Sequence, residues 1–550
     1  MKFLSIKKII TLVTAFTLVF SVTAQNLEKE IDEIVSSAYI DSEPGVAILV
    51  AKNGQSIYRK AFGKANLELD VAMKAENIFE LASITKQFTA MAILMLEEQG
   101  KLKVEDSITK FIPDYPTKGK KITIHHLLNH TSGIKSYTSM GLAELARKDM
   151  TPIELIDYFK NEPMDFDPGE KYQYNNSGYI LLGHIIEVVT KDTYENFIEK
   201  QIFESLDMTS SRYGSMIELI KNRATGYQKD GNGFRNADYL SLTLPYAAGS
   251  LMSTVDDMLK WQNALKTHKL INKESFDKAI NGSTLNSGKK IEYGYGLGKS
   301  NLQGSIGYQH SGGIFGYTTN GIYLINEDVY VIGLSNCSCN DIGAVTTKIA
   351  ALVIGKPFPD KKNAITLSKD KLNKWVGAYE FKQGVVRFIM PKDGKLVSQR
   401  EGSTVFSIFP LSDTHFIFDE GTISYYFSVD DKGKKQVKMT TIGGETIGKE
   451  IDKKPPVENK EITVNETVLK QYIGAYELQP GFNLVMTVED GKLYAQATGQ
   501  PKNQLFAKSQ TRFFLKVVSA EVEFIKDDSG KYSSCVLYQG GQEMKGKRKN

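Results

Sequence analysis

A serine and a lysine three positions apart stand at the start of a long helical pattern. The stretch Glu80–Glu98 reads ELASITKQFTAMAILMLEE, so Ser83 and Lys86 share one face of the predicted helix. A serine hydroxyl attacks a carbonyl only when a base takes its proton, and a desolvated lysine can serve as that base. The positive end of the helix dipole also disfavours the ammonium form of Lys86. The pair indicates nucleophilic catalysis, although Ser-x-x-Lys alone also arises by chance on solvated surfaces.

A tyrosine and an asparagine form a second polar cluster, in the loop before an apolar helix. Asp167-Pro168-Gly169 predicts a turn, and Ser177 is expected to cap a helix over Gly178–Thr190. This arrangement puts the phenol of Tyr174 and the amide of Asn176 where side chains can point into a cleft.

Two glycines follow a histidine in the third polar segment, His310-Ser311-Gly312-Gly313. We expect this segment at the start of a sheet strand, followed by a second strand-like run over Gly321–Ile325. Glycines within a strand allow a ligand to approach the backbone closely. The segment is therefore a candidate edge of a binding site.

With these three segments in this order, the chain resembles the penicillin-recognising serine hydrolases, which include class C β-lactamases, DD-peptidases, esterases and D-aminopeptidases. The resemblance covers roughly residues 27–355. It departs from the usual S-D-N and K-T-G elements in Tyr174-Asn175-Asn176 and His310-Ser311-Gly312. Further matching stretches are Ile122–Ile134, Ala248–Met258 and Tyr293–Gly298. The resemblance implies an α+β, β-lactamase/transpeptidase-like domain, in which helices flank an antiparallel sheet and a helical subdomain adjoins it.

The resemblance also implies a role for each of these side chains. Ser83 would form an acyl-enzyme, and Lys86 and Tyr174 would share the transfer of its proton as one coupled pair. A nearby ammonium would lower the pKa of Tyr174, which is otherwise near 10. Asn176 would hydrogen-bond Lys86 and the substrate amide. The backbone N–H groups of Ser83 and Gly313 would form the oxyanion hole.

His310 stands where β-lactamases usually carry a lysine, and Ser311 and Gly312 would contact the substrate beside it. Because histidine is mostly neutral near pH 7, it should hold a substrate carboxylate less strongly than lysine. Such His-x-Gly variants occur among D-aminopeptidases and esterases of the family. Strong β-lactamase activity is therefore not expected.

His126 and His130 have the spacing that zinc uses on a helix, but position 127 is leucine and no third ligand is evident. Packing or helix capping is the preferred interpretation of both histidines. The sequence predicts neither a metal nor another cofactor.

The elements needed to hold these residues are recognisable. A helix is expected over Leu27–Ala38, and Asn53-Gly54 joins two strands, Gly45–Lys52 and Gln55–Ala61. A polar, helix-rich stretch follows the nucleophile helix, and strand patterns resume late in this region, ending with Val329–Ser335 and a helix over residues 343–354. The early and late strands must share one sheet, because neither set can bury itself alone.

An internal repeat begins after this region. Gly377-Ala-Tyr-Glu380 recurs as Gly474-Ala-Tyr-Glu477, and Asp393-Gly-Lys-Leu396 recurs as Asp490-Gly-Lys-Leu493. Each copy is a series of short strand patterns with Gly/Asp turns, which predicts a small, lipocalin-like antiparallel β-barrel. The predicted core includes Tyr379, Phe381, Phe416, Tyr476 and Phe513. The expected domains are a signal peptide at 1–24, the hydrolase at 25–358, and barrels at 368–450 and 465–546.

Residues 1–24 have the features of a secretory signal. Lys2, Lys7 and Lys8 precede the apolar run Ile9–Val22, and Val22-Thr23-Ala24 offers a small-residue cleavage site. An uncleaved anchor is the alternative. The formal net charge is +4, and it falls to about +1 without these lysines, so nothing indicates a nucleic-acid partner.

Cysteine is sparse, with Cys337, Cys339 and Cys535 as the complete set. A single residue between the first two is poor for zinc and strained for a disulfide, so buried thiols are the preferred interpretation.

The sequence predicts a secreted, periplasmic serine hydrolase that forms an acyl-enzyme on an amide or ester of a small-molecule or peptide substrate. Peptides are the leading class, and peptides with D-amino acids are included in it. An esterase or weak β-lactamase is the enzymatic alternative. A penicillin-binding sensor without turnover, or a cell-wall binding protein, is the alternative of another class. The oligomeric state stays open.

Overall fold

The computed structural model describes residues 25–231, 233–419, 421–441, 444–455, 461–479, 481–518, 520–539 and 542–549. The expected signal sequence at 1–24 lies outside these residues. The chain divides into two compact units, Met1–Phe358 and Pro359–Asn550. Within the described part of the chain, no helix combines the length and the apolar character that a membrane span requires.

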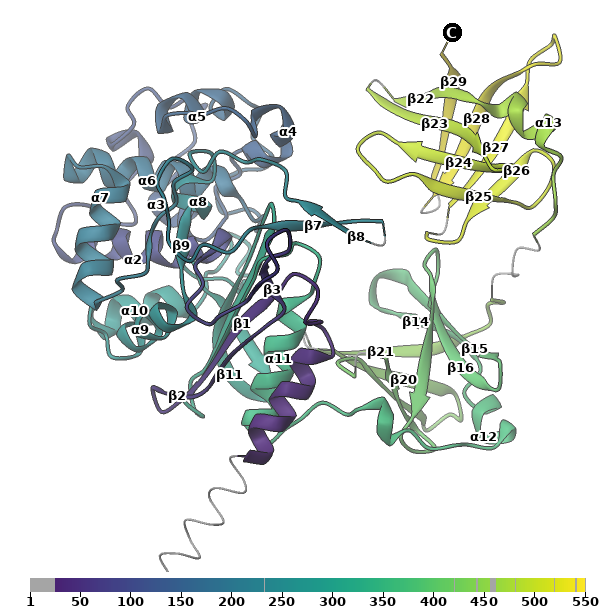
Figure 1. The fold of residues 1–550 in the computed structure, drawn as a ribbon, viewed down its shortest axis with the longest axis horizontal. Helices are drawn as coiled ribbons and strands as arrows, with labels where there is room; N and C mark the ends of the chain where they lie inside the picture. Colours follow the sequence, from purple (N-terminus) through teal and green to yellow (C-terminus); the bar gives the residue numbers. More distant parts are fainter. Residues whose placement is uncertain are drawn as a thin grey trace, which may run out of the picture. The chain divides into compact units, whose positions relative to one another are not determined.

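A six-stranded antiparallel sheet forms the centre of the first unit (Figure 1). Strands from both ends of this unit pair directly, since Val46 lies opposite Ser335 and Lys52 lies opposite Val329. The turn that joins the first two strands has left-handed backbone angles at Asn53, as the Asn-Gly pair predicts. In spatial order the strands are β10 (Gly298–Leu302), β11 (Ser305–Ile314), β12 (Tyr317–Leu324), β13 (Val329–Ser335), β1 (Val46–Lys52) and β2 (Gln55–Phe62).

Helices cover both faces of this sheet. The even-numbered residues of β1 from Val46 to Val50 share a core with the helical turns over 25–36 and with α11 (Ile342–Val353), which lie side by side in Figure 1. The odd-numbered residues of β1 enter a second, larger core on the other face. Successive side chains of a strand point to opposite faces, and both faces of β1 are buried. The sequence of β1 is therefore a continuous apolar run.

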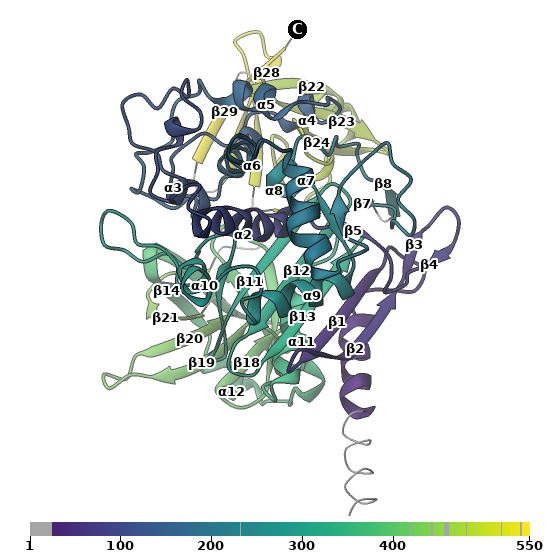
Figure 2. The same cartoon turned by 90° about the vertical axis from the view of Figure 1, so that its left-hand side faces the viewer.

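Helix α2 (Thr85–Glu98) lies on the second face, with α6 (Asn176–Thr190) and α8 (Tyr246–Gly249) packed beyond it (Figure 2). Most of α2 is fully buried, which explains why its sequence carries no broad polar stripe. The other helices of this unit are α3 (Ile124–Leu128), α4 (Leu142–Leu145), α5 (Pro152–Phe159), α7 (Tyr194–Ile198), α9 (Val255–Lys266) and α10 (Lys273–Ile280). Three small sheets are formed by β3 (Lys64–Asn66) with β4 (Val71–Ala72), by β5 (Phe79–Glu80), β9 (Leu251–Ser253) and β6 (Arg212–Tyr213), and by β7 (Tyr227–Asp230) with β8 (Gly233–Asn236).

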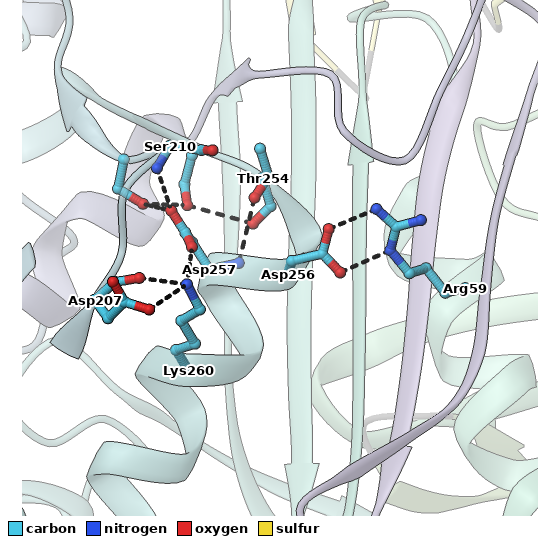
Figure 3. A network of polar contacts seen from close by, with 9 residues as sticks. Arg59, Asp207, Ser210, Thr254, Asp256, Asp257 and Lys260 are labelled. Carbon is cyan, nitrogen blue, oxygen red and sulfur yellow. Dashed lines mark hydrogen bonds and ion pairs between the residues drawn. The ribbon is translucent and has the colours of Figure 1, made fainter.

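A polar network joins α9 to the edge strand β2 and to the loop before β6 (Figure 3). Asp257 is almost fully buried, accepts the backbone N–H of Ser210 at 2.8 Å and pairs with Lys260 at 3.0 Å. The adjacent Asp256 is half-exposed and accepts two 2.7 Å hydrogen bonds from Arg59. Two neighbouring carboxylates therefore fix one helix to two separate segments.

The second unit contains two closed antiparallel barrels of eight strands each, so the predicted fold class is confirmed. The strands of the first are β14 (Gly377–Phe381), β15 (Val385–Lys392), β16 (Lys395–Arg400), β17 (Val405–Pro410), β18 (His415–Phe418), β19 (Ser424–Val429), β20 (Lys435–Thr441) and β21 (Gly444–Ile451). Those of the second are β22 (Gly474–Gln479), β23 (Phe482–Glu489), β24 (Lys492–Ala497), β25 (Asn503–Ala507), β26 (Arg512–Leu515), β27 (Ala520–Lys526), β28 (Tyr532–Gln539) and β29 (Gln542–Arg548). A short helix precedes each barrel, α12 (Lys369–Asn373) and α13 (Glu466–Leu469).

The two barrels repeat the same internal contacts. In the first, Trp375 stacks on Phe427 with ring centroids 5.2 Å apart and donates from Nε1 to the carbonyl of Asp413. In the second, Tyr472 stacks on Phe524 at 4.2 Å and donates to the carbonyl of Gln510. The aromatic side chains predicted to be core are all buried, namely Tyr379, Phe381, Phe416, Tyr476 and Phe513.

Candidate active site

Ser83 lies in a single 3-10 turn, η1 (Ala82–Ile84), directly before α2. Its neighbour Ala82 has a φ of 49°, a left-handed conformation that residues with a Cβ rarely adopt. Such conformations persist where the surrounding structure determines them, and they occur often at functional sites.

Strands β11 and β12 supply that surrounding structure. A Cβ atom on Gly312 would lie 2.3 Å from the carbonyl oxygen of Leu81, so only glycine permits this approach. Thr319 on β12 donates a 2.9 Å hydrogen bond to the same oxygen. Gly312, for which the sequence predicts a contact with the substrate, lies against the turn that carries Ser83.

Lys86 is completely buried and has three partners. Its Nζ lies 2.8 Å from Oδ1 of Asn176, 2.8 Å from the carbonyl oxygen of Ala248 and 3.1 Å from Oγ of Ser83. Burial lowers the pKa of Lys86 well below its ordinary value. A neutral amine has two N–H groups, which match the two carbonyl oxygens, and one lone pair, which faces the Ser83 hydroxyl.

Tyr174 lies on the other side of the lysine, with the centre of its ring 4.9 Å from Nζ. Its hydroxyl end lies beside the side chain of Ser83, which partly offsets the effect of burial on the pKa of Tyr174. The side chain is 37% exposed overall, but the hydroxyl end is enclosed and burial raises the pKa of Tyr174. The expected lowering by an ammonium does not occur, because burial favours the neutral form of Lys86. Tyr174 is therefore a proton donor in this state.

Helix α6 begins at Asn176, two residues earlier than the sequence predicted. Asn175 caps it and accepts the N–H of Gly178 at 2.9 Å. Ser177, the expected cap, is buried and accepts the backbone N–H of Tyr137 at 2.9 Å.

Asn176 consequently stands on the first turn of α6 with its amide oriented by two partners. Its Oδ1 accepts from Lys86, and its Nδ2 donates to Oγ1 of Thr138 at 3.3 Å. The predicted contact between Asn176 and Lys86 is present in the structure.

His310 lies in the middle of β11 and not at its start. One ring nitrogen, Nδ1, donates to the carbonyl of Ser311 at 2.7 Å, and Nε2 accepts from the hydroxyl of Tyr293 at 2.8 Å. Burial, with a smaller effect of Lys86, lowers the pKa of His310 to about 3. A neutral ring with both nitrogens engaged has no donor left for a substrate carboxylate. Ser311 itself is exposed.

A cavity of about 320 Å³ opens beside Ser83. Asn176 and Gly313 line it together with Ser83, so three of the predicted site residues meet at one end. Around Gly313 the space is open, since no atom lies within 4 Å of a Cβ built there. The remaining lining residues are Ala82, Tyr137, Thr138, Leu142, Gln228, Leu240, Leu244, Pro245, Ala248, Gly249, Ile314, Phe315 and Ser338. Sequence reasoning missed these walls because they come from loops and short helices without a common pattern.

The two histidines at zinc-like spacing have other partners. His126 caps α3, since its Nδ1 accepts the N–H of Thr123 at 3.2 Å. His130 is buried behind Tyr174, with ring centroids 4.3 Å apart, and accepts the N–H of Asn175 at 3.1 Å. Among the residues that the structure describes, no three histidine, cysteine or acidic side chains gather as metal ligands do.

The preferred interpretation of the cysteines was wrong for two of them. Cys337 and Cys339 form a disulfide after β13, where the chain turns and brings their Cα atoms within 5.1 Å, inside the usual range. Ser338 between them lines the cavity. Cys535 is a buried free thiol, as expected.

Known proteins match both units. A family model described as beta-lactamase matches residues 27–352, and one described as a domain of unknown function (DUF3471) matches residues 458–548. Penicillin-binding protein 4* of Bacillus subtilis (strain 168) is 28% identical over 537 residues, which cover 94% of this chain and 98% of the relative.

Solved structures match the fold of the chain. The octameric penicillin-binding protein homologue from Pyrococcus abyssi is 28% identical with a TM-score of 0.55, covering 77% of this chain and 99% of the homologue. A D-amino acid amidase from Ochrobactrum anthropi SV3 shares the fold at 21% identity and a TM-score of 0.53, covering 61% of this chain and 98% of the amidase.

Proposed function

The chain belongs to the beta-lactamase family, and on this basis we propose that it is a serine hydrolase that cleaves an amide or an ester through an acyl-enzyme. The observation that carries the proposal is the position of Lys86, a buried amine with a lowered pKa and its Nζ 3.1 Å from Oγ of Ser83. An amine in this state can take the hydroxyl proton near neutral pH.

Acylation begins when Ser83 attacks the substrate carbonyl and its proton moves to Lys86. The backbone N–H groups of Ser83 and Gly313 stabilise the oxyanion of the tetrahedral intermediate. Tyr174, whose hydroxyl is protonated and adjacent to Ser83, donates a proton to the leaving amine or alkoxide. The proton on Lys86 then restores the phenol. Asn176 holds the amine in place throughout, through its 2.8 Å contact.

Deacylation repeats these transfers with water in place of Ser83 as the nucleophile. Lys86 takes a proton from the water, the oxyanion forms in the same hole, and Tyr174 donates a proton to the oxygen of Ser83 as this group leaves. The proton on Lys86 then restores the phenol. Because Lys86 and Tyr174 exchange one proton, their roles belong to the pair.

An amide substrate is favoured by two relatives of this fold, and D-amino-acid peptides are the leading class within it. Esters are the alternative, because the engaged ring nitrogens of His310 leave nothing to bind the carboxylate of a peptide or β-lactam.

Secretion into an oxidising compartment is part of the proposal. The basic and apolar pattern of residues 1–24 supports it, as does the disulfide between Cys337 and Cys339, since disulfides persist mainly outside the reducing cytosol.

A fluorophosphonate probe tests the nucleophile. We expect covalent labelling at Ser83, found by peptide mass spectrometry, and loss of labelling and of ester turnover in Ser83→Ala. The exposed Ser36 serves as a control, since Ser36→Ala should change neither. Labelling that persists in Ser83→Ala would refute the assignment.

A further inference from the structure

The wall of the cavity beside Ser83 is apolar around most of its circumference. Besides Ser83 and the peptide backbone, the polar side chains that line it are Asn176, Thr138, Gln228, Ser338 and the phenol of Tyr137. The apolar part of the wall consists of Leu142, Leu240, Leu244, Pro245, Ile314 and Phe315, with Ala82 and Ala248. Its volume, about 320 Å³, lies within the range of small-molecule sites.

No lysine, arginine, histidine, aspartate or glutamate is among the described residues that line this cavity. The two basic side chains of the reaction centre do not replace them. Burial lowers the pKa of His310 to about 3, so this ring is neutral near pH 7. Burial also lowers the pKa of Lys86 well below its ordinary value, which favours the neutral amine. Each is also saturated, Lys86 by three partners and His310 by two.

A charged group entering this cavity would lose water and find no ion of opposite sign. Desolvating an ionised carboxylate or ammonium without a partner is far more unfavourable than desolvating a methyl group. Each added methylene of an apolar chain, in contrast, favours burial by about fourfold in equilibrium. The wall therefore discriminates against both a free carboxylate and a free ammonium.

We propose that this cavity binds the acyl portion of the substrate and that this portion is uncharged and apolar, such as a medium-length alkanoyl or arylalkanoyl group. The proposal rests on the proposed function, because it assumes that Ser83 is acylated. It narrows the acyl portion to neutral groups and, among the peptides of the proposed function, excludes those with a free α-amino group on the acyl side of the scissile bond.

Three p-nitrophenyl esters of equal chain length test the charge preference in the full-length protein. The acyl groups are hexanoyl, carboxylate-terminated adipoyl and ammonium-terminated 6-aminohexanoyl. We expect kcat/KM for the hexanoate to exceed that of both charged esters by about tenfold or more. In the series acetate, butanoate, hexanoate we expect about fourfold per methylene. A charged ester that reacts as fast as the hexanoate would overturn the proposal.

A charge introduced into the wall should change this order. Ile314 follows Gly313 on β11, is half-buried and lines the cavity, so Ile314→Lys should raise the adipate relative to the hexanoate by about tenfold. Ile306 lies on the same strand, is 58% exposed and does not line the cavity. Ile306→Lys should leave the ratio unchanged. The same shift in both variants would mean that overall charge, and not the wall, sets the preference.

A binding measurement separates this proposal from the catalytic one. Ser83→Ala cannot be acylated, so its affinity for hexanamide, adipic acid monoamide and 6-aminohexanamide reports the cavity alone, by calorimetry. Tighter binding of hexanamide supports the apolar acyl site even if no fluorophosphonate labels Ser83 in the unsubstituted chain. Equal or tighter binding of a charged amide contradicts it, even if Ser83 is labelled and esters turn over.

Discussion

Lys86 has as many partners as a neutral amine can serve, two carbonyl oxygens and one hydroxyl. An ammonium there would have to direct a third N–H toward the very oxygen that must lose its proton. The protonation state of Lys86 is thus decided by which atoms surround it, as well as by the lack of water. This gives the site both its base and a dependence on pH.

Lys86→Met should lower kcat by about 10²–10⁴-fold, because the general base is removed. It should also remove part of the pH dependence of stability. Since the pKa of Lys86 in the folded chain lies below the unfolded value of about 10.4, the unfolded chain binds one more proton between these two values. The free energy of unfolding therefore rises with pH in that window, and this slope should flatten in the variant.

Denaturant titrations between pH 7 and pH 10 measure this slope. The two carbonyl groups left unpaired in Lys86→Met shift the free energy of unfolding by an amount that does not depend on pH, so they leave the slope unaffected. Lys101→Met, at an exposed position after α2, is the control and should keep the slope. An unchanged slope in Lys86→Met would mean that Lys86 is protonated in the folded chain.

Tyr174→Phe should lower kcat by about 10²–10⁴-fold, because the leaving group loses its proton donor. The double variant with Lys86→Met should be little worse than the more damaging single variant, since residues that act as a unit give non-additive losses. Steady-state kinetics on a small ester measure all three variants. Tyr172→Phe removes a neighbouring phenol and should retain activity. Losses that multiply fully would show that the two residues act in separate steps.

The site was predictable at the positions where spacing carries the chemistry. Only two residues separate Ser83 from Lys86 at the start of the helix, and this spacing brings their side chains into contact. The contact between Asn176 and the lysine was implied by the family resemblance. The state of His310 was not predictable, because it depends on the hydroxyl of Tyr293, which a different segment supplies. The sequence did not predict that Leu142 and Phe315 line the cavity, because an isolated apolar residue cannot be distinguished from a core residue by its sequence context.

Among the elements, β11 approaches the turn of Ser83 so closely that a Cβ atom on Gly312 would lie 2.3 Å from the carbonyl oxygen of Leu81. Gly312→Ala should push the new methyl group against the carbonyl of Leu81 and displace Ser83. A displacement of about 1 Å is enough to lower kcat by about 10²-fold. The free energy of unfolding should fall by about 1–3 kcal/mol, because the site is overpacked.

Activity and thermal unfolding measured together test this effect. Gly233→Ala is the matched control, because the nearest atom to a methyl group there is the Asp230 carbonyl oxygen at 3.8 Å. It should change neither quantity. Full activity in Gly312→Ala would show that the turn can move without loss of alignment.

The network at the start of α9 allows a comparison of two adjacent carboxylates (Figure 3). Asp257→Ala leaves the buried N–H of Ser210 unpaired and should lower the free energy of unfolding by about 2–3 kcal/mol. Asp256→Ala removes a half-exposed pair with Arg59 and should lower it by about 1 kcal/mol or less. Denaturant titration measures the free energy of unfolding of both variants. A larger loss in Asp256→Ala than in Asp257→Ala would contradict the conclusion that Asp257 contributes more to holding α9 in place.

Element boundaries were the weakest part of the prediction. The strand Val329–Ser335 was found because β13 is apolar on both faces. The start of α6 was predicted too late, because asparagine and serine are both good N-caps. Which of the two caps the helix depends on a distant residue, since the hydroxyl of Ser177 already accepts the backbone N–H of Tyr137. The disulfide was not predicted, because it depends on a turn after β13 that brings the two Cα atoms within 5.1 Å, and the spacing of the cysteines does not reveal this turn.

On the scale of the whole molecule, each unit has its own cores, and every residue proposed for catalysis lies in Met1–Phe358. A chain ending at Phe358 should therefore fold, be labelled at Ser83 and cleave a small ester. Circular dichroism and a substrate panel measure these outcomes. A folded chain that is not acylated would mean that the barrels supply part of the site.

The repeated barrels also pose a problem of assembly order. Each barrel closes only when its first strand meets its last, so β14 must wait for β21, and β22 for β29. While both are open, strands of one copy could be recruited by the other, a common misfolding route for tandem repeats. The stacked ring at the matching position differs, Trp375 in one and Tyr472 in the other. Because the partner ring is a phenylalanine in both barrels, Phe427 or Phe524, the same kind of stacking would form in a hybrid barrel. Synthesis from the N-terminus favours the correct pairing, since it lets the first barrel close before the second is complete.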